Sequence, residues 1–144
     1  MIEREVEIQE ARADHSASLA NLIAELGYDV QAEELKDRLN KMPADLYRTF
    51  VALKAEQVVG FLGLILLPVY EHTRPVGWIL ALSVSPRHRR QGIGRKLLET
   101  AEACCRDRQA VDLRLHSGLQ REEAHEFYEK LGYAKSGYRF KKRL

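Results

Sequence analysis

An apolar run in the middle of the chain limits the folds that this sequence can adopt. Six of the seven residues from 61 to 67 are large and apolar, and Gly63 is the exception. A strand with one face in water alternates polar and apolar residues, whereas a strand covered on both faces is apolar throughout. We therefore predict that residues 57–67 form a central strand with other elements on both faces of its sheet. A short turn at Ala55 and Glu56 is expected to join it to a strand over residues 49–54.

The spacing of apolar residues divides the rest of the chain into helices and strands. Asp14 is the expected N-cap of the first helix, and Gly27 and Gly132 are expected to end the first and last helices. In the helix that begins near Gly94, the spacing places Cys104 on the buried face. The predicted strands lie near residues 6–11, 49–54, 57–67, 78–84, 111–115 and 133–140, and the predicted helices near residues 14–26, 32–40, 94–104 and 124–131. This order, β-α-α-β-β-β-α-β-α-β, predicts an α/β (α+β) chain with helices on the faces of a mixed sheet.

Length and composition indicate a single domain over residues 1–144, because no linker or break in composition interrupts the chain. The formal net charge of +2 gives no sign of a nucleic-acid partner. Cys104 and Cys105 are neighbours, which argues against a disulfide framework, and no residues have the spacing of a metal site. No signal peptide or membrane-spanning run is recognisable, so we expect the cytoplasm and no membrane partner.

A glycine-rich turn stands between a predicted strand and a predicted helix, with the spacing Arg89-x-x-Gly92-x-Gly94. Free N–H groups at a helix start form a site for anions, and the four arginines between residues 87 and 95 favour a phosphate ester. The same residues are also compatible with an ordinary turn and a solvated arginine face. The dinucleotide fingerprint fails because Leu97 stands where a third glycine is needed, and the Gly-Lys-Ser/Thr of a P-loop is absent.

The spacing that does fit resembles the acetyl-coenzyme A signature of the GNAT superfamily of N-acetyltransferases. Residues 81–86 resemble the strand before that signature, residues 89–98 its loop and helix, and residues 124–133 the family's later helix end. This resemblance implies one domain with a mixed, mostly antiparallel sheet of six to seven strands and about four helices. It also implies acetyl-coenzyme A as cosubstrate, no metal, and transfer of acetyl to a primary amine by direct attack in a ternary complex.

The resemblance also implies which residues meet the coenzyme. The amides from Arg89 to Arg95 would hold the pyrophosphate, and the backbone near residues 82–84 would pair with the pantetheine arm and polarise the thioester. Arg121 stands where many relatives have an asparagine that reaches the cofactor. The residues assigned to the coenzyme are Leu82, Ser83, Val84, Arg89, Arg90, Gln91, Gly92, Ile93, Gly94, Arg95 and Arg121.

Tyr128 matches the family's tyrosine that protonates the departing thiolate, because a phenol stays protonated at neutral pH. The spacing of Tyr128 from the other apolar residues of its helix, taken alone, is also that of a core residue. Some relatives place a glutamate base early on the strand before the signature, where this chain has Trp78. The candidates for the base are therefore Glu71, His72 and His116, each of which is also compatible with an ordinary exposed residue.

The acceptor is not identified by these motifs. Acidic residues in the first two helices and in the loop over residues 68–75 would suit a cationic acceptor, or they are solvated helix faces. A small amine or an aminoglycoside-like acceptor is favoured. The alternatives are a protein lysine or N-terminal acetyltransferase, and a non-catalytic module that binds acyl-coenzyme A. The resemblance is compatible with a homodimer.

Overall fold

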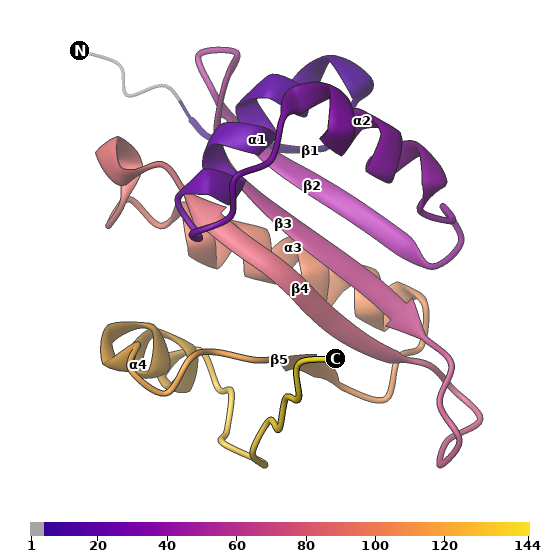
Figure 1. Ribbon diagram of the computed structural model, residues 1–144. Coiled ribbons are helices and arrows are strands. Elements are labelled where there is room, and N and C mark those ends of the chain that lie inside the picture. Colours follow the sequence, from indigo (N-terminus) through magenta and orange to yellow (C-terminus); the bar gives the residue numbers. More distant parts are fainter. Residues whose placement is uncertain (1–4) are drawn as a thin grey trace. The chain divides into compact units, whose positions relative to one another are not determined.

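The computed structural model describes residues 5–144 and divides the chain into two compact units, which end at Arg114 and Leu144 (Figure 1). The first unit carries most of the sheet and the helices α1, α2 and α3. Its elements are β1 (Glu7–Glu10), a 3₁₀ turn (Ala13–His15), α1 (Ser16–Ala24), α2 (Ala32–Lys41), β2 (Tyr47–Lys54), β3 (Gln57–Leu67), β4 (Val76–Val84), a second 3₁₀ turn (Pro86–His88), α3 (Ile93–Asp107) and β5 (Leu113–Leu115), whose last residue belongs to the second unit.

The sheet has the strand order β1-β2-β3-β4-β5, and the first four strands pair antiparallel. The Val111 N–H donates to the Pro75 carbonyl, and the Gly77 N–H donates to the Asp112 carbonyl, each at 2.9 Å. These two bonds advance along both segments in the same direction, as in a parallel pair. The sheet is therefore mixed, as predicted.

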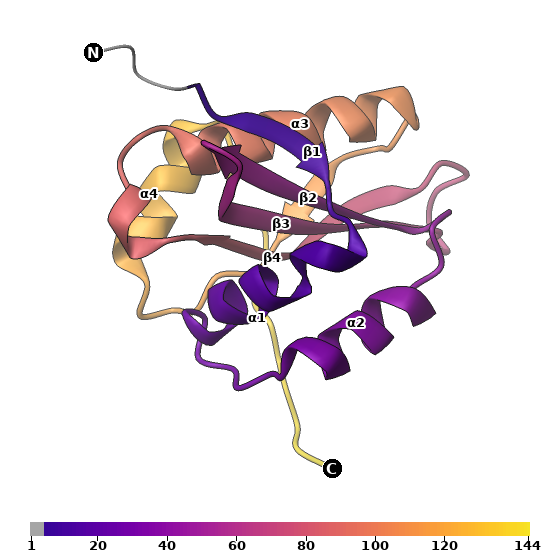
Figure 2. The same cartoon turned by 90° about the horizontal axis from the view of Figure 1, so that it is seen from above.

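The prediction of a central strand over residues 57–67 is confirmed. β3 lies between β2 and β4, and α1 and α3 contact it from opposite faces of the sheet (Figure 2). Leu62 is fully buried, and so is Val51 on the neighbouring β2. On one face, Val51 and Phe61 pack in a cluster with α1 and α2. On the other face, Gly60 lets Ile93 and Leu97 of α3 approach closely.

The first helix begins differently from the prediction. Asp14 lies in the 3₁₀ turn, and α1 begins at Ser16 with His15 at its N-cap. The 3₁₀ turn takes up residues 13–15, so Asp14 lies one residue before the N-cap position, and its carboxylate pairs with Arg12 at 3.2 Å.

The buried face of α3 ends at Cys105, so the prediction of Cys104 was wrong. Ala101 and Cys105 are four positions apart and both are buried, whereas Cys104 is only half-buried. Burial raises the pKa of the Cys105 thiol to about 11, with Cys104 and Glu102 contributing in the same direction. Cys105 packs against Gly77, where a Cβ would overlap the sulfur.

The second unit holds α4 (Glu122–Lys130), which Gly132 follows at a φ of 95°. The prediction of a strand over residues 133–140 was wrong, because this segment has no regular secondary structure. Tyr138 and Phe140 are 84% and 93% exposed, so no apolar burial offsets the entropy cost of ordering a strand there. Among residues 5–144 the sheet therefore has five strands rather than six to seven, and the order ends at the fourth helix. Within residues 5–144, no helix is both long and apolar enough to cross a bilayer.

Candidate functional site

A β-bulge interrupts β4 shortly before the glycine-rich turn. Gly63 of β3 pairs with Ala81 and Leu64 pairs with Ile79, so Leu80 has no partner on β3 and is 55% exposed. A bulge leaves its extra residue out of the ladder and bends the strand. The bulge lies just before the residues 82–84 that were predicted to offer backbone groups. Those residues keep their partners on β3.

The side chain of Ser83 is committed to the fold. Ser83 is buried, and its hydroxyl donates to the Leu22 carbonyl of α1 at 3.0 Å. This bond ties β4 to α1. It leaves only the main chain of Ser83 for a ligand.

The glycine-rich turn runs directly into α3, which begins at Ile93, one residue before the predicted start. Gly92 precedes the helix in the left-handed region at a φ of 79°, and a Cβ there would meet no atom within 4 Å. The first intrahelical bond runs from the Lys96 N–H to the Gly92 carbonyl at 3.1 Å. The amides of the three preceding residues therefore have no acceptor within the helix, and the helix dipole adds partial positive charge at this end.

Cationic side chains surround this turn and connect it to two neighbouring elements. The Arg89 guanidinium donates to the Val84 carbonyl at 3.4 Å and lies 3.9 Å from the Glu25 carboxylate at the end of α1. The Lys54 ammonium, at the end of β2, donates to the Gln91 side-chain oxygen at 2.9 Å. Lys54 had no signal in the sequence, because its nearness to the turn depends on how the β2–β3 hairpin packs.

Two of the candidates for the base lie in the loop between β3 and β4. Glu71 and His72 are adjacent and exposed in the β3–β4 loop. His72 borders a cavity of about 340 Å³ that Asp45 and Arg108 also line. The Glu71 carboxylate instead acts on Arg114, whose pKa is raised mainly by its hydrogen bonds to Asp112 and further by Glu71. Glu71 and His72 therefore have different surroundings.

Arg114 is a second residue that the sequence analysis missed. Its guanidinium donates to both Asp112 oxygens, at 2.9 and 3.3 Å, and its carbon lies 5.9 Å from the centre of the Trp78 ring. A Cβ on Gly77 would point at Cys105 of α3 and at Leu113. Because side chains alternate along a strand, Trp78 and Arg114 belong to the opposite face of the sheet from α3.

Tyr128, Arg121 and His116 lie in the second unit. Burial raises the pKa of the Tyr128 phenol, and the nearby charge of Arg121 acts in the opposite direction. The Tyr128 ring lies 5.3 Å from that of Phe127 and 6.1 Å from that of Tyr133, measured between ring centres. The phenol is therefore packed among aromatic rings and protonated at neutral pH.

The comparisons with known proteins agree with the motifs at the glycine-rich turn and in α4. The sequence pattern described as the Acetyltransferase (GNAT) family matches residues 16–133. The chain belongs to this family. An aminoalkylphosphonate N-acetyltransferase of Salmonella typhimurium strain LT2 is 33% identical over 141 residues, which cover 96% of this chain and 91% of that protein. The chain is accordingly an acyltransferase.

Solved structures of acetyltransferases share the fold. A Trypanosoma brucei acetyltransferase matches with a TM-score of 0.85 at 23% identity, over 97% of this chain and 100% of the other. An aminoglycoside acetyltransferase from an uncultured soil metagenomic sample matches with a TM-score of 0.78 at 22% identity, over 97% and 99% of the two chains. The GNAT match spans both the glycine-rich turn and α4, and residues 134–144 lie beyond it.

Proposed function

We propose that this acetyltransferase uses acetyl-coenzyme A as donor and transfers the acetyl group to the primary amine of a small molecule. The observation that carries this proposal is the glycine-rich turn. Gly92 adopts a left-handed conformation with open space beside it, and the 15-residue helix α3 starts immediately after it. Backbone amides without a helical acceptor and a surrounding group of cations suit a pyrophosphate.

In this proposal the main chain holds most of the coenzyme. The amides from Arg89 to Arg95 bind the pyrophosphate, and the exposed arginines of the turn add charge. The backbone of β4 from Leu80 to Val84 meets the pantetheine arm, because the bulge and the short neighbouring strand β5 favour access to that edge. Arg121 is proposed as a further phosphate contact. Together with the family match over residues 16–133, these roles support a single catalytic domain made of both units.

The reaction proceeds by direct attack. The nitrogen lone pair of the acceptor attacks the thioester carbonyl carbon, the carbon–sulfur bond breaks, and the amine nitrogen loses one proton. A backbone N–H of β4 stabilises the carbonyl oxygen as it gains negative charge. Tyr128 donates its proton to the leaving thiolate, and burial keeps the phenol protonated by raising its pKa.

The amine must be neutral before it can attack, so a proton acceptor is needed. Glu71 is the first residue to test as base, because its charge acts on Arg114, whose guanidinium lies beside the Trp78 ring on the face of the sheet opposite α3. His72 borders a different cavity. His116 remains a second candidate, and a chain of water molecules is the alternative to any single base.

The acceptor class rests on the relatives. The Salmonella relative acts on aminoalkylphosphonates by its name and aligns over nearly the whole chain, which favours a small amine over a protein. An aminoalkylphosphonate and an aminoglycoside are therefore the first acceptors to test. A lysine side chain or a protein N-terminus is the alternative acceptor, and a non-catalytic acyl-coenzyme A sensor is the alternative function.

A thiol-release assay tests the proposal. Acetyl-coenzyme A is incubated with the protein and, in separate reactions, with an aminoalkylphosphonate, an aminoglycoside, a polyamine and a lysine-containing peptide. We expect free thiol and an acetylated product, identified by its mass, with at least one small amine. Release with the peptide alone would reassign the acceptor class. Coenzyme binding without release above the amine-free rate would instead favour the non-catalytic module.

A further inference from the structure

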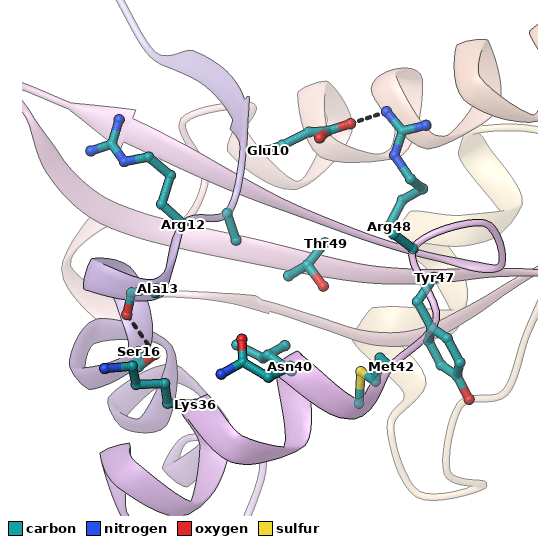
Figure 3. Close-up of a pocket in the computed structure, with 13 residues that line it drawn as sticks. Glu10, Arg12, Ala13, Ser16, Lys36, Asn40, Met42, Tyr47, Arg48 and Thr49 are labelled. Atoms are coloured by element: carbon teal, nitrogen blue, oxygen red, sulfur yellow. Dashed lines mark hydrogen bonds and ion pairs between the residues drawn. The ribbon is translucent and has the colours of Figure 1, made fainter.

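A cleft lies far from the glycine-rich turn, between α2, the end of β1 and the start of β2 (Figure 3). Its volume is about 500 Å³, within the usual range of small-molecule sites. Thr49, near the start of β2, lines the cleft, whereas Lys54 at the other end of that strand contacts Gln91. Five residues of extended strand separate Thr49 from Lys54 by roughly 17 Å. The cleft is therefore a separate place from the proposed donor site.

The cleft exists because α2 packs on α1. Leu35, the buried residue of α2, joins the cluster formed by Leu19 and Leu22 of α1. The helix then ends at Lys41, and the chain turns toward β2 with the Tyr47 N–H donating to the Pro43 carbonyl at 2.9 Å. The face of α2 next to Leu35 therefore borders the cleft.

Polar groups on that face of α2 line the cleft. Lys36 and Asn40 are four residues apart, so they lie one above the other on the helix. Asn40 of α2 and Thr49 of β2 both line the cleft (Figure 3). An ammonium, an amide and a hydroxyl therefore border one space and all can donate hydrogen bonds.

The charges of the lining favour a ligand with one negative charge. Arg12 pairs with Asp14 at 3.2 Å, and Arg48 pairs with Glu10, which also lines the cleft. Within residues 5–144, the Lys36 ammonium has no ion-pair partner. One lining cation, Lys36, is thus left for a ligand, which suits a ligand with a single negative charge.

Apolar side chains lie along the same cleft. Leu39 of α2, Met42 and Tyr47 are also among the lining residues. Met42 is 37% exposed although it is large and apolar. The lining therefore combines hydrogen-bond donors with an apolar wall, which suits an amphipathic ligand.

We propose that this cleft binds a small organic carboxylate with an apolar group. The carboxylate accepts hydrogen bonds from Lys36 and Asn40, which lie one turn apart on α2. The apolar group lies against Leu39, Met42 and Tyr47. This site is distinct from the proposed binding of acetyl-coenzyme A and does not depend on it.

Phenylacetate is a suitable probe because it carries one carboxylate and one apolar ring, and phenylacetamide is its neutral counterpart. Binding is followed by the amide signals of Lys36, Asn40 and Thr49 in nitrogen-15 correlation spectra of the full chain. We expect phenylacetate to shift these signals and to reach saturation, whereas phenylacetamide and inorganic phosphate leave them in place.

Two matched variants sharpen this test. Lys36→Met keeps the apolar stem and removes the charge, and should weaken phenylacetate binding about tenfold or more. Lys41→Met removes an exposed charge from the last turn of the same helix, outside the cleft, and should leave binding unchanged. Equal losses in both variants would overturn the proposal, as would an absence of saturable shifts or a response to phosphate alone.

A third variant separates this proposal from the donor site. Gly92→Val should lose acetyl-coenzyme A binding and keep phenylacetate binding. Loss of both ligands, with the fold intact by melting temperature, would contradict the independence of the cleft. Failure of acetyl transfer in the parent protein would leave the phenylacetate result unaffected, so the two proposals fail separately.

Discussion

Replacement of Gly92 by alanine tests the glycine-rich turn quantitatively. Gly92 has a φ of 79°, and a Cβ there would meet no atom within 4 Å. An L-residue in the left-handed region costs about 1–2 kcal/mol, and no steric clash is added at this position. If the turn keeps its shape, Gly92→Ala should therefore lower the free energy of unfolding by about 1–2 kcal/mol.

The same strain can instead weaken the binding of acetyl-coenzyme A. If the free turn relaxes in Gly92→Ala, the binding conformation must be restored when acetyl-coenzyme A binds. The dissociation constant should then rise by roughly 5- to 30-fold, the equivalent of the same strain energy. The loss of stability and the loss of affinity together should amount to about 1–2 kcal/mol.

Denaturant unfolding measures the first quantity and titration calorimetry the second. Gly27→Ala is a matched control, because Gly27 has a φ of 97° and a Cβ there would also meet no atom within 4 Å, but this glycine lies after α1. The control substitution should reduce stability by a similar amount without changing the affinity for acetyl-coenzyme A. The reasoning is refuted if Gly92→Ala changes neither quantity, or if Gly27→Ala raises the dissociation constant equally.

Other substitutions separate packing from catalysis. Gly77→Ala should lower the free energy of unfolding by about 1–3 kcal/mol because its Cβ overlaps the Cys105 sulfur, and adding Cys105→Ala should restore part of the loss; unchanged denaturation midpoints would contradict this. Tyr128→Phe should reduce kcat by about 100-fold or more with little change in coenzyme affinity, whereas an unchanged kcat would assign Tyr128 to packing. Burial raises the pKa of the Tyr128 phenol above 10.0, so loss of its proton should reduce kcat only above pH 10. If kcat of the parent protein falls at a lower pH and kcat of Tyr128→Phe does not, this expectation is contradicted. Lys54→Met removes the contact with Gln91 and should raise the coenzyme dissociation constant by about fivefold at most, because the exposed ammonium is screened by water. Titration calorimetry measures this constant. A larger rise would indicate that Lys54 contacts the coenzyme directly.

The sequence was most informative where burial leaves a strong pattern. The apolar run from 61 to 67 predicted the central strand, because only a strand covered on both faces is apolar throughout. The start of α3 was predicted to within one residue, since Gly92 and the apolar spacing after it both mark it. Cys104 was misplaced because two neighbouring cysteines offered equally plausible continuations of the apolar stripe.

Features that depend on pairing or on tertiary packing were beyond the sequence. The bulge at Leu80 is defined by the register between β3 and β4, which no single strand specifies. The segment over residues 133–140 has aromatic residues compatible with a strand, but its apolar side chains are exposed. The contacts of Lys54 and Arg114 join residues far apart in the chain or on different strands. The motifs of the proposed site could therefore be predicted from the sequence, whereas the contacts that Lys54 and Arg114 make could not.

The most direct test of the central claim is the melting temperature of the protein with acetyl-coenzyme A, ATP or NAD. A ligand at about one hundred times its dissociation constant stabilises the folded state by about 2.7 kcal/mol, which raises the melting temperature of a chain of this size by several degrees. We predict this rise with acetyl-coenzyme A and none with ATP or NAD at the same concentration. Equal stabilisation by ATP, or no response to acetyl-coenzyme A, would contradict the assignment of the glycine-rich turn as a coenzyme A site.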